Sequence, residues 1–296
     1  MTLPPPDYLT TREVADLIRL KERKVYDLVA AGEIPFVRVT GKLLFPRVLV
    51  EAWLLRNAEF GGGLESLSAR PPICVGSHDP LLDWALREAH TGLAVGFGGS
   101  LDGLERFARA EGLMAGMHIP EGARGWNSEH VRSKLPGQPV ILIEWARRRQ
   151  GLIVAAGNPA SLESVADLPG RRIILRQPES GTFVLLESLL NKAGLDMTAL
   201  DRSLPPALTQ TDVALAVAEG RAEAGLGIAA VAHQYRLGFV PLAEERYDLL
   251  IWRAAYFEPP LQKLMAFTRT QRFSAKAAEL GGYDISLQGA VHYNAP

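Results

Sequence analysis

Apolar residues near the N-terminus recur at helical spacing in two short segments. Val14, Leu17 and Ile18 fall on one face of the first segment, and residues 25–29 repeat the spacing in the second. Polar and charged residues occupy the other faces, so each segment has one side to bury and one side for solvent. The pattern predicts two adjacent amphipathic helices.

The ends of both helices are marked by capping residues. Thr10 can cap the first helix, and Glu13, three residues later, can reach back to the amide of Thr10. Gly32 supplies a left-handed stop for the second helix, and Pro35 lies just beyond it. Both helices are therefore short, and a turn at residues 19–21 joins them.

A different pattern follows the second helix. Residues 36–39 and 43–45 are apolar or β-branched runs on either side of a turn at residues 40–42, which is typical of a β-hairpin. Residues 50–54 then have the spacing of a third buried helix face. Helix, helix, hairpin and helix together are a compact way of holding one helix against DNA.

Residues 8–54 resemble the excisionase-like, MerR-related winged helix-turn-helix family in their helix starts, the Gly32 stop, the hairpin and Trp53. The apolar Val48 departs from the small polar helix cap that is common in that family. The resemblance implies that the second helix enters a major groove and that the hairpin, as a wing, reaches the DNA backbone or minor groove. Candidates for base-edge or phosphate contacts are Arg23, Lys24 and Tyr26, and candidates for phosphate contacts are Arg19, Lys21, Arg38, Lys42 and Arg47.

Charge alone does not establish DNA binding. Residues 1–60 contain nine Lys or Arg and eight Asp or Glu, so they lack the bulk basic charge that nucleic-acid binders often show. A solvated charged helix in a protein-interaction module is the alternative. Four of the nine basic residues lie between Arg19 and Lys24, and this placement favours double-stranded DNA as the partner.

The composition changes after the third predicted helix. Glycines at 61–63 and the sequence Arg70-Pro71-Pro72 bracket a stretch without a strong period. We therefore predict a winged helix-turn-helix domain at residues 1–57, a linker at 58–72 and a second domain at 73–296.

In the second domain, short aliphatic runs alternate with helical patterns such as residues 81–88 and 184–191. The aliphatic runs are residues 73–75, 93–95, 140–143, 152–154 and 173–175. Strands that alternate with helices are typical of an α/β domain with mainly parallel sheets.

Three turns between a predicted strand and a predicted helix carry hydroxyl groups. They are residues 76–80, with Asp79 as an expected helix cap, residues 98–100 and residues 179–182. Each turn places free backbone amides and a small hydroxyl side chain at a helix start, which suits an anion. Ordinary helix capping is the alternative explanation for these hydroxyl groups.

Motifs throughout the second domain carry a further resemblance. They are residues 76–80, 99–100, 115–120, 126–127, 149–154, 157–159, 167–168, 176–178, 180–182, 220–222, 224–227, 245–248 and 281–284. With them, residues 73–290 are similar to type 2 periplasmic-binding-protein-like domains, in the branch that resembles molybdate and tungstate binders. Such domains occur fused to DNA-binding domains and to molybdenum-cofactor proteins.

The resemblance implies a two-lobed, Venus-flytrap domain with a ligand trapped between the two lobes. Two crossing strands, near residues 141–154 and 247–252, would join the lobes. Neutral donors suit a dehydrated oxyanion. Glu179 is a departure, because a carboxylate pointing inward would repel an anion, so either it faces solvent or the ligand differs. The implied ligand contacts are Ser77, Ser100, Ser180, Gly181 and Thr182, with Arg149 and Gly227 near the hinge.

Catalytic motifs are weak by comparison. Ser77-His78-Asp79 contains the residue types of a hydrolase triad, but consecutive side chains cannot converge and no G-x-S-x-G elbow surrounds them. Neither a complete dinucleotide fingerprint nor a phosphate-loop G-K-[ST] sequence is present. The six histidines lack metal-ligand spacing, and we expect His118 to pack or support rather than react. No catalytic residue, resident cofactor or metal site is predicted.

The composition, with 47% hydrophobic and 22% charged residues, is that of an ordinary soluble protein. The N-terminal residues lack the basic and apolar regions of a signal peptide, and no segment approaches an uncharged membrane span. The lone Cys74 excludes an internal disulfide, which fits a reducing compartment. We therefore expect a cytoplasmic protein without a membrane partner.

Together these features predict a one-component transcriptional regulator with a small-molecule effector, most plausibly molybdate or tungstate. We expect a homodimer, because one winged domain buries little protein surface on DNA. A molybdenum-cofactor accessory protein or enzyme with the same ligand-binding domain is one alternative, and a sensor of a small organic ligand is another. A third is a phage-type architectural DNA binder whose larger domain serves dimerisation.

Overall fold

The computed structural model describes residues 7–39, 41–57 and 70–295. The contacts divide the chain into two compact units, Met1–Leu67 and Ser68–Pro296. Most of the predicted linker, residues 58–69, lies outside the described residues, as does residue 40 of the predicted hairpin turn.

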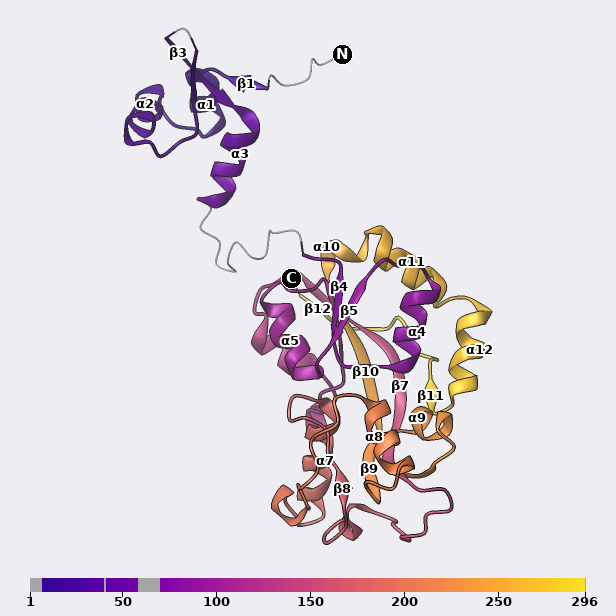
Figure 1. Cartoon of the computed structure of the whole chain (residues 1–296). Helices are drawn as coiled ribbons and strands as arrows, with labels where there is room; N and C mark the ends of the chain where they lie inside the picture. Colours follow the sequence, from indigo (N-terminus) through magenta and orange to yellow (C-terminus); the bar gives the residue numbers. More distant parts are fainter. Residues whose placement is uncertain (1–6, 40, 58–69, 296) are drawn as a thin grey trace. The chain divides into compact units, whose positions relative to one another are not determined.

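The N-terminal unit has the predicted order of helix, helix, hairpin and helix, with one additional short strand (Figure 1). Its elements are β1 (Tyr8–Leu9), α1 (Thr11–Leu17), α2 (Glu22–Ala31), β2 (Val37–Val39), β3 (Lys42–Pro46) and α3 (Arg47–Arg56). The strands form an antiparallel sheet in the order β1-β3-β2. Val14, Val25, Phe45 and Val50 are buried together, so one small core holds the helices on the sheet.

The predicted helix ends of this unit are present. Thr10 Oγ1 accepts a hydrogen bond from the Glu13 amide at 3.3 Å, and Glu13 Oε2 accepts one from the Thr10 amide at 2.7 Å, which completes a capping box. Gly32 ends α2 with φ 70°, the left-handed conformation that glycine adopts without steric cost.

Two details of this unit differ from the prediction. Leu17 is 40% exposed, because α1 ends at this residue and Ala15 occupies the buried face instead. Helix α3 begins at Arg47, directly after β3, and Val48 is exposed. The hairpin, rather than a polar cap, therefore leads directly into the third helix.

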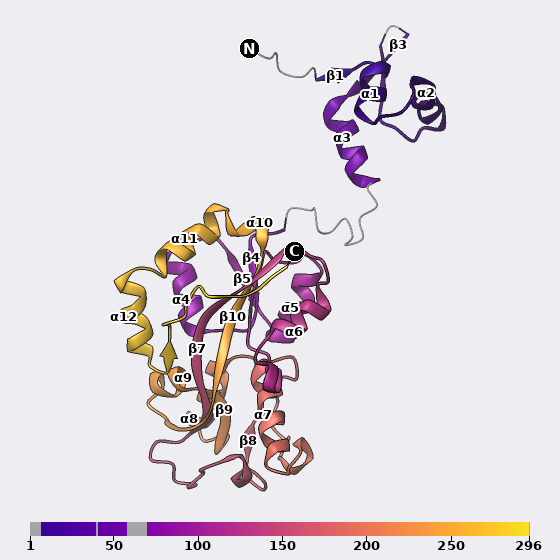
Figure 2. The ribbon, with the colours of Figure 1, turned by 180° about the vertical axis from the view of Figure 1, so that it is seen from behind.

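The larger unit consists of two lobes that share one sheet (Figures 1 and 2). Lobe 1 contains β4 (Ile73–Gly76), α4 (Pro80–Glu88), β5 (Ala94–Phe97), α5 (Ser100–Ala108), β6 (Met114–Met117), η2 (Gly122–Arg124), α6 (Ser128–Lys134), α10 (Arg253–Tyr256), α11 (Pro259–Phe267), α12 (Gln271–Leu280), β11 (Tyr283–Asp284) and β12 (Val291–Asn294). Lobe 2 contains η3 (Val165–Asp167), β8 (Ile173–Ile174), α7 (Gly181–Lys192), η4 (Met197–Ala199), α8 (Gln210–Ala218), β9 (Ala224–Ile228) and α9 (Ala229–Gln234).

Two long strands connect the lobes, as the resemblance implied. They are β7 (Val140–Val154) and β10 (Gly238–Trp252), and they pair antiparallel along their length. The aliphatic runs at residues 140–143 and 152–154, predicted as separate strands, are the two ends of β7. Both views show these strands passing from lobe 1 into lobe 2, so they are the hinge of the unit (Figures 1 and 2).

The strand order of the sheet is β5-β4-β6-β10-β7-β9-β8, with β11 and β12 also paired to β7. β4 is parallel to β5 and β6, and β8 is parallel to β9. The centre is antiparallel, because β10 runs against β6 and β7, and β7 runs against β9. The prediction of mainly parallel sheets is therefore wrong: the two connecting strands return in opposite directions between the lobes.

Candidate functional site

The predicted ligand-binding turns of the two lobes meet in the structure. The amide of Leu101 in lobe 1 donates to the carbonyl of Glu179 in lobe 2 at 2.9 Å, and Gln177 Nε2 donates to the carbonyl of Gly98 at 3.2 Å. Four hydroxyl residues of these turns are buried in the same region, and they are Ser77, Ser100, Ser180 and Thr182. The lobes are thus closed over a polar interior.

Glycine allows this close approach on both sides. A Cβ atom on Gly181, the first residue of α7, would overlap the carbonyl oxygen of His118. A Cβ on Gly99 would lie 2.7 Å from the carbonyl oxygen of Glu179, and Gly99 has φ +112°. The start of α7 therefore lies against Gly99 at the start of α5 and against His118 after β6, because Gly99 and Gly181 carry no side chain at these contacts.

Backbone amides at these helix starts have no hydrogen-bond partner among the residues that the structure describes. They belong to Ser100 of α5 and to Gly181 and Thr182 of α7. The first amides of a helix cannot be satisfied within the helix, and together with the helix dipole they attract negative charge. Two helix starts from opposite lobes thus supply donors to one place.

A hydrogen-bonded series begins at Ser77. Its Oγ lies 3.0 Å from Nε2 of His118, and His118 Nδ1 lies 2.7 Å from Oε2 of Glu245. Burial lowers the pKa of His118 more than the neighbouring Glu245 raises it. The neutral ring therefore donates from Nδ1 to Glu245 and accepts the Ser77 hydroxyl at Nε2.

This order of hydrogen bonds is also that of a serine-hydrolase triad. All three side chains are completely buried with the lobes closed. The residues that sequence reasoning tested for a triad, Ser77, His78 and Asp79, do not form one: the structure brings a more distant histidine to Ser77.

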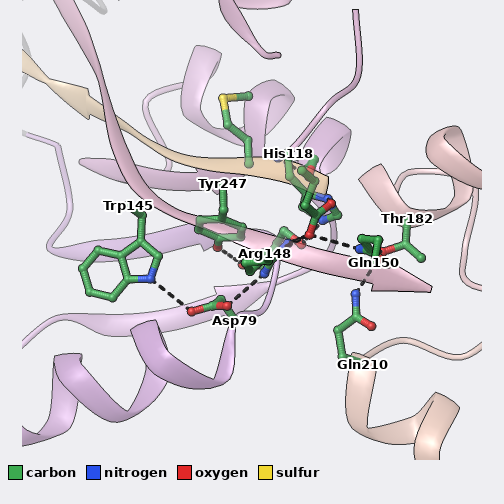
Figure 3. A network of polar contacts seen from close by, with 12 residues as sticks. Asp79, His118, Trp145, Arg148, Gln150, Thr182, Gln210 and Tyr247 are labelled. Atoms are coloured by element: carbon green, nitrogen blue, oxygen red, sulfur yellow. Dashed lines mark hydrogen bonds and ion pairs between the residues drawn. The ribbon is translucent and has the colours of Figure 1, made fainter. Parts of the chain in front are cut away.

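Arg148 of β7 anchors this series to lobe 1 (Figure 3). Its Nε donates to Glu245 at 2.8 Å and its Nη1 donates to Asp79 at 2.9 Å. Burial raises the pKa of Glu245, but the charge of Arg148 and the hydrogen bonds from His118 and Gln150 outweigh burial and hold it at about 2. Glu245 is therefore ionised and acts only as an acceptor.

Asp79 is the N-cap of α4, as predicted. Its Oδ1 accepts from the amide of Leu82 at 2.8 Å, and its carboxylate also accepts from Trp145 and Tyr283. The chain's own carboxylate thus occupies the start of α4. Of the three predicted anion-binding helix starts, only those of α5 and α7 keep free amides.

Two glutamines surround Thr182 (Figure 3). Thr182 Oγ1 accepts from Gln150 Nε2 at 3.3 Å and from Gln210 Nε2 at 2.9 Å, so its own hydrogen is available to another acceptor. The Oε1 atoms of both glutamines are buried and lack a partner among the described residues. Gly227 packs beside this group, since a Cβ there would lie 2.9 Å from Oε1 of Gln210.

Arg176, just after β8, is a buried cation without a carboxylate partner in the described part of the chain. Its Nε donates to the carbonyl of Ala207 at 3.1 Å and its Nη2 to that of Leu208 at 3.0 Å, while Nη1 is buried without a partner. The neighbouring Asp212 accepts from backbone amides instead. Burial lowers the pKa of Arg176 to about 10, so the group is still charged at neutral pH.

The predicted contact Arg149 lies outside this buried group, and so does the carboxylate of Glu179. Arg149 is exposed on β7, because side chains alternate along a strand and those of Arg148 and Gln150 face the interior. Glu179 is also exposed, and only its backbone carbonyl takes part in the contact between the lobes. Its carboxylate is therefore not an obstacle to an anion.

Sequence reasoning did not assign a ligand role to His118, Gln150, Arg176 or Gln210. No local signal marked Gln150, which follows three arginines and precedes the apolar run at residues 152–154. The partners of these residues are far apart in the chain, and His118 and Glu245 are separated by 127 positions. Among the described residues, no group of three or more His, Cys, Asp or Glu side chains is placed to hold a metal ion.

The predicted DNA-contacting residues lie on α2, the turn before it, the wing and the start of α3. Those on α2 and the preceding turn are exposed, including Tyr26 at 51%. A groove of about 600 Å³ separates α2 from the wing, and Tyr26, Arg38 and Lys42 are among its lining residues. Arg47 differs from the others, because it is half-buried and 3.6 Å from Glu51.

Comparison with known families agrees with both units. Residues 84–269, more than half of the chain, match the PBP superfamily domain, and the chain belongs to this family. Residues 8–58 match a helix-turn-helix domain. The first is a ligand-binding type of domain and the second a DNA-binding type, and this combination is consistent with a regulator. No helix in the described segments is long and apolar enough to cross a membrane.

Two relatives are similar in sequence. The uncharacterized protein YvgK of Bacillus subtilis (strain 168) is 25% identical over 300 residues, which cover 95% of this chain and 96% of the relative. An uncharacterized protein in the ferredoxin 2Fe-2S gene 5′ region of Clostridium pasteurianum is 29% identical over 109 residues, or 36% of this chain and 96% of that protein.

Solved structures share the fold at low sequence identity. A putative phosphate ABC transporter substrate-binding protein from Clostridium perfringens, with bound phosphate, has a TM-score of 0.54 at 10% identity and covers 70% of this chain and 96% of that chain. The sulfate-binding protein SubI from Mycobacterium tuberculosis H37Rv has a TM-score of 0.51 at 13% identity, with coverages of 71% and 84%. A cysteine-to-serine mutant of Corynebacterium glutamicum OxyR, H2O2-bound, has a TM-score of 0.50 at 13% identity, with coverages of 92% and 89%.

Proposed function

We propose that this protein is a cytoplasmic one-component transcriptional regulator whose larger unit senses a small oxyanion and whose helix-turn-helix unit binds an operator. The observation that carries the sensing role is Arg176. A buried guanidinium without a carboxylate partner is costly, and a bound anion would compensate its charge.

Neutral donors near this charge support a small, dehydrated anion. The amides of Ser100, Gly181 and Thr182 and the hydroxyl of Thr182 have hydrogens to offer. An oxyanion with four acceptor oxygens can use several such donors at once.

Molybdate and tungstate are the first candidates, because the sequence motifs of the larger unit resemble the binders of these ions. Phosphate and sulfate form the comparison set, since two proteins of the same fold are described as binding them. Because closed lobes would enclose the ion, they could select it by size as well as by charge.

Calorimetry on the full-length protein tests this proposal with molybdate, tungstate, sulfate and phosphate. Arg176→Gln should weaken binding of the preferred ion by about 1–3 kcal/mol, roughly fivefold to 150-fold, because a charge-assisted bond to the ion is lost. Arg149→Gln is the matched control: it removes an exposed arginine of the same unit and should leave affinity unchanged.

The parent's failure to bind any of the four ions would overturn the oxyanion proposal and favour an organic effector. Equal losses in Arg176→Gln and Arg149→Gln would reject the assignment of Arg176. If the bound ion controls DNA affinity, the preferred ion should shift operator binding of the parent in a gel-shift or fluorescence assay. It should do so less in Arg176→Gln at the same ion concentration.

A further inference from the structure

The series Ser77, His118 and Glu245 has one fixed end. Glu245 is held as a carboxylate by Arg148 and can only accept, so the proton in its 2.7 Å bond belongs to Nδ1 of His118. The other ring nitrogen, Nε2, lies 3.0 Å from Ser77 Oγ and is the position at which His118 can gain a proton.

The state of Nε2 decides what Ser77 offers to a ligand. With Nε2 unprotonated, Ser77 donates its single hydrogen to His118 and presents only lone pairs elsewhere. With Nε2 protonated, His118 donates to Ser77 Oγ and the hydroxyl hydrogen is free to turn toward a ligand. A fully deprotonated oxyanion can only accept, so it requires the second state.

We infer that His118 adjusts its own protonation to that of the effector. A fully deprotonated oxyanion binds at Ser77 together with uptake of about one proton at His118 Nε2. A ligand that carries its own proton can donate to Ser77 and bind without this uptake. The inference rests on the proposed function, because it concerns the same site.

Charged and titratable groups face this part of the interior from every side. They are Glu245 and Tyr247 of β10, Arg148 of β7, Arg176 after β8, and His78 and Asp79 after β4. The ring of Tyr247 stacks on His118 with centroids 5.8 Å apart. Before a ligand arrives, burial and the two guanidinium charges disfavour an imidazolium more than Glu245 favours it. A deprotonated anion at Ser77 changes this balance through the hydrogen bonds, because it needs the hydroxyl hydrogen that Ser77 otherwise donates to Nε2.

His78 is the other histidine near the site. Its Nδ1 is buried without a partner among the described residues, and its ring packs edge-on against Phe97 with centroids 5.3 Å apart. It has no hydrogen bond to Ser77, so it serves as a control for a proton taken up elsewhere.

Calorimetry of full-length protein with molybdate, in buffers of different ionisation enthalpy, measures proton uptake directly. The parent should take up about one proton, and its affinity should fall about tenfold per pH unit above neutrality. Ser77→Ala should bind more weakly and without uptake, because no hydroxyl then couples the ligand to Nε2. His118→Gln should bind without this pH dependence.

Ser100→Ala is the matched control for Ser77→Ala. Ser100 is equally buried, but its Oγ accepts from the backbone amide of His118 at 3.1 Å and not from the ring. This variant should bind more weakly than the parent and still take up the proton. His78→Gln should also keep the uptake.

Three outcomes would overturn the inference while the proposed function stands: molybdate binding by the parent without uptake, uptake that persists in Ser77→Ala, and uptake that is lost in His78→Gln. Persistence in Ser77→Ala would mean that the anion acts on a titrating group through space. Absence of binding in the parent would reject both the inference and the choice of molybdate, and would be visible in the same titration as a lack of heat.

Discussion

At the scale of single residues, the larger unit buries charges in two kinds of environment. Arg148 lies between two carboxylates, so its charge is compensated on both sides. Asp248 lies 3.0 Å from Arg246 and accepts a hydrogen bond from the side-chain amide of Asn127 at 2.7 Å. Burial raises the pKa of Asp248 more than these two partners lower it, and the result is a pKa of about 6. The first arrangement favours ionisation, and the second opposes it.

Asp248 should therefore make stability fall as pH rises. Its pKa is raised above 3.8 in the folded state, so its contribution is fully present below about pH 3.8 and is lost as pH passes through about 6. Between roughly pH 4 and 7, the free energy of unfolding of the parent should fall relative to Asp248→Asn by on the order of 2–3 kcal/mol. Urea unfolding at several pH values measures this difference.

The two stability curves should approach or cross as pH rises. Curves that stay parallel over this range would show that Asp248 has the same pKa in the folded and unfolded states. Asp284→Asn is a suitable control, because this exposed aspartate has a lowered pKa and should give a small effect of the opposite sign.

At the scale of elements, α2 and the wing form the candidate DNA surface. Val25 is buried and fixes the rotation of α2, so Arg23 and Lys24 are left exposed. Lys42 begins β3 on the far side of the groove from α2. One helix and one hairpin of this kind can contact a major groove and the adjacent backbone together.

Alanine at Arg23 or at Lys24 should weaken operator binding by about 1–3 kcal/mol if these residues reach base edges. Lys42→Ala should instead lower the slope of log affinity against log salt by roughly one unit, because one phosphate contact is lost. Fluorescence anisotropy over a salt series measures both quantities. Lys192→Ala, an exposed lysine at the end of α7, is the control. If Arg23→Ala, Lys24→Ala and Lys42→Ala all bind the operator like the parent, α2 and the wing are not the DNA-contacting surface.

At the scale of the whole molecule, one winged domain offers only a small surface to DNA, roughly 600–1,000 Å². Useful specificity then requires two copies on repeated half-sites, so we expect a homodimer assembled through the larger unit or the segment between the units. Light scattering at micromolar concentration should give twice the chain mass. A monomer that binds one isolated half-site at full affinity would contradict this expectation.

Lobe closure is the other property of the whole molecule. The lobes meet through backbone contacts such as Leu101 to Glu179, and a ligand between them adds contacts that an open form lacks. A ligand can influence DNA binding only through such a difference in affinity between two states. The hinge strands β7 and β10 carry Arg148, Gln150 and Glu245, so the site and the hinge share residues.

The sequence by itself determined features that depend on neighbours in the chain. The Thr10–Glu13 capping box, the Gly32 stop, the hairpin and the Asp79 cap each depend on contacts a few residues away, and each is present. The α/β class of the larger unit and its hydroxyl-bearing turns also followed from local pattern. These are the interactions that a short window of sequence contains.

Only the tertiary structure decided the features that depend on register and long-range pairing. Which of Arg148 and Arg149 faces the interior depends on the pairing of β7 with β10, because a shift of one residue exchanges the two faces of a strand. The antiparallel centre of the sheet and the partnership of His118 with Glu245 likewise join distant segments. Arg176 stands out only because no carboxylate pairs with it among the described residues, and this depends on how the folded chain directs Asp212 to backbone amides instead.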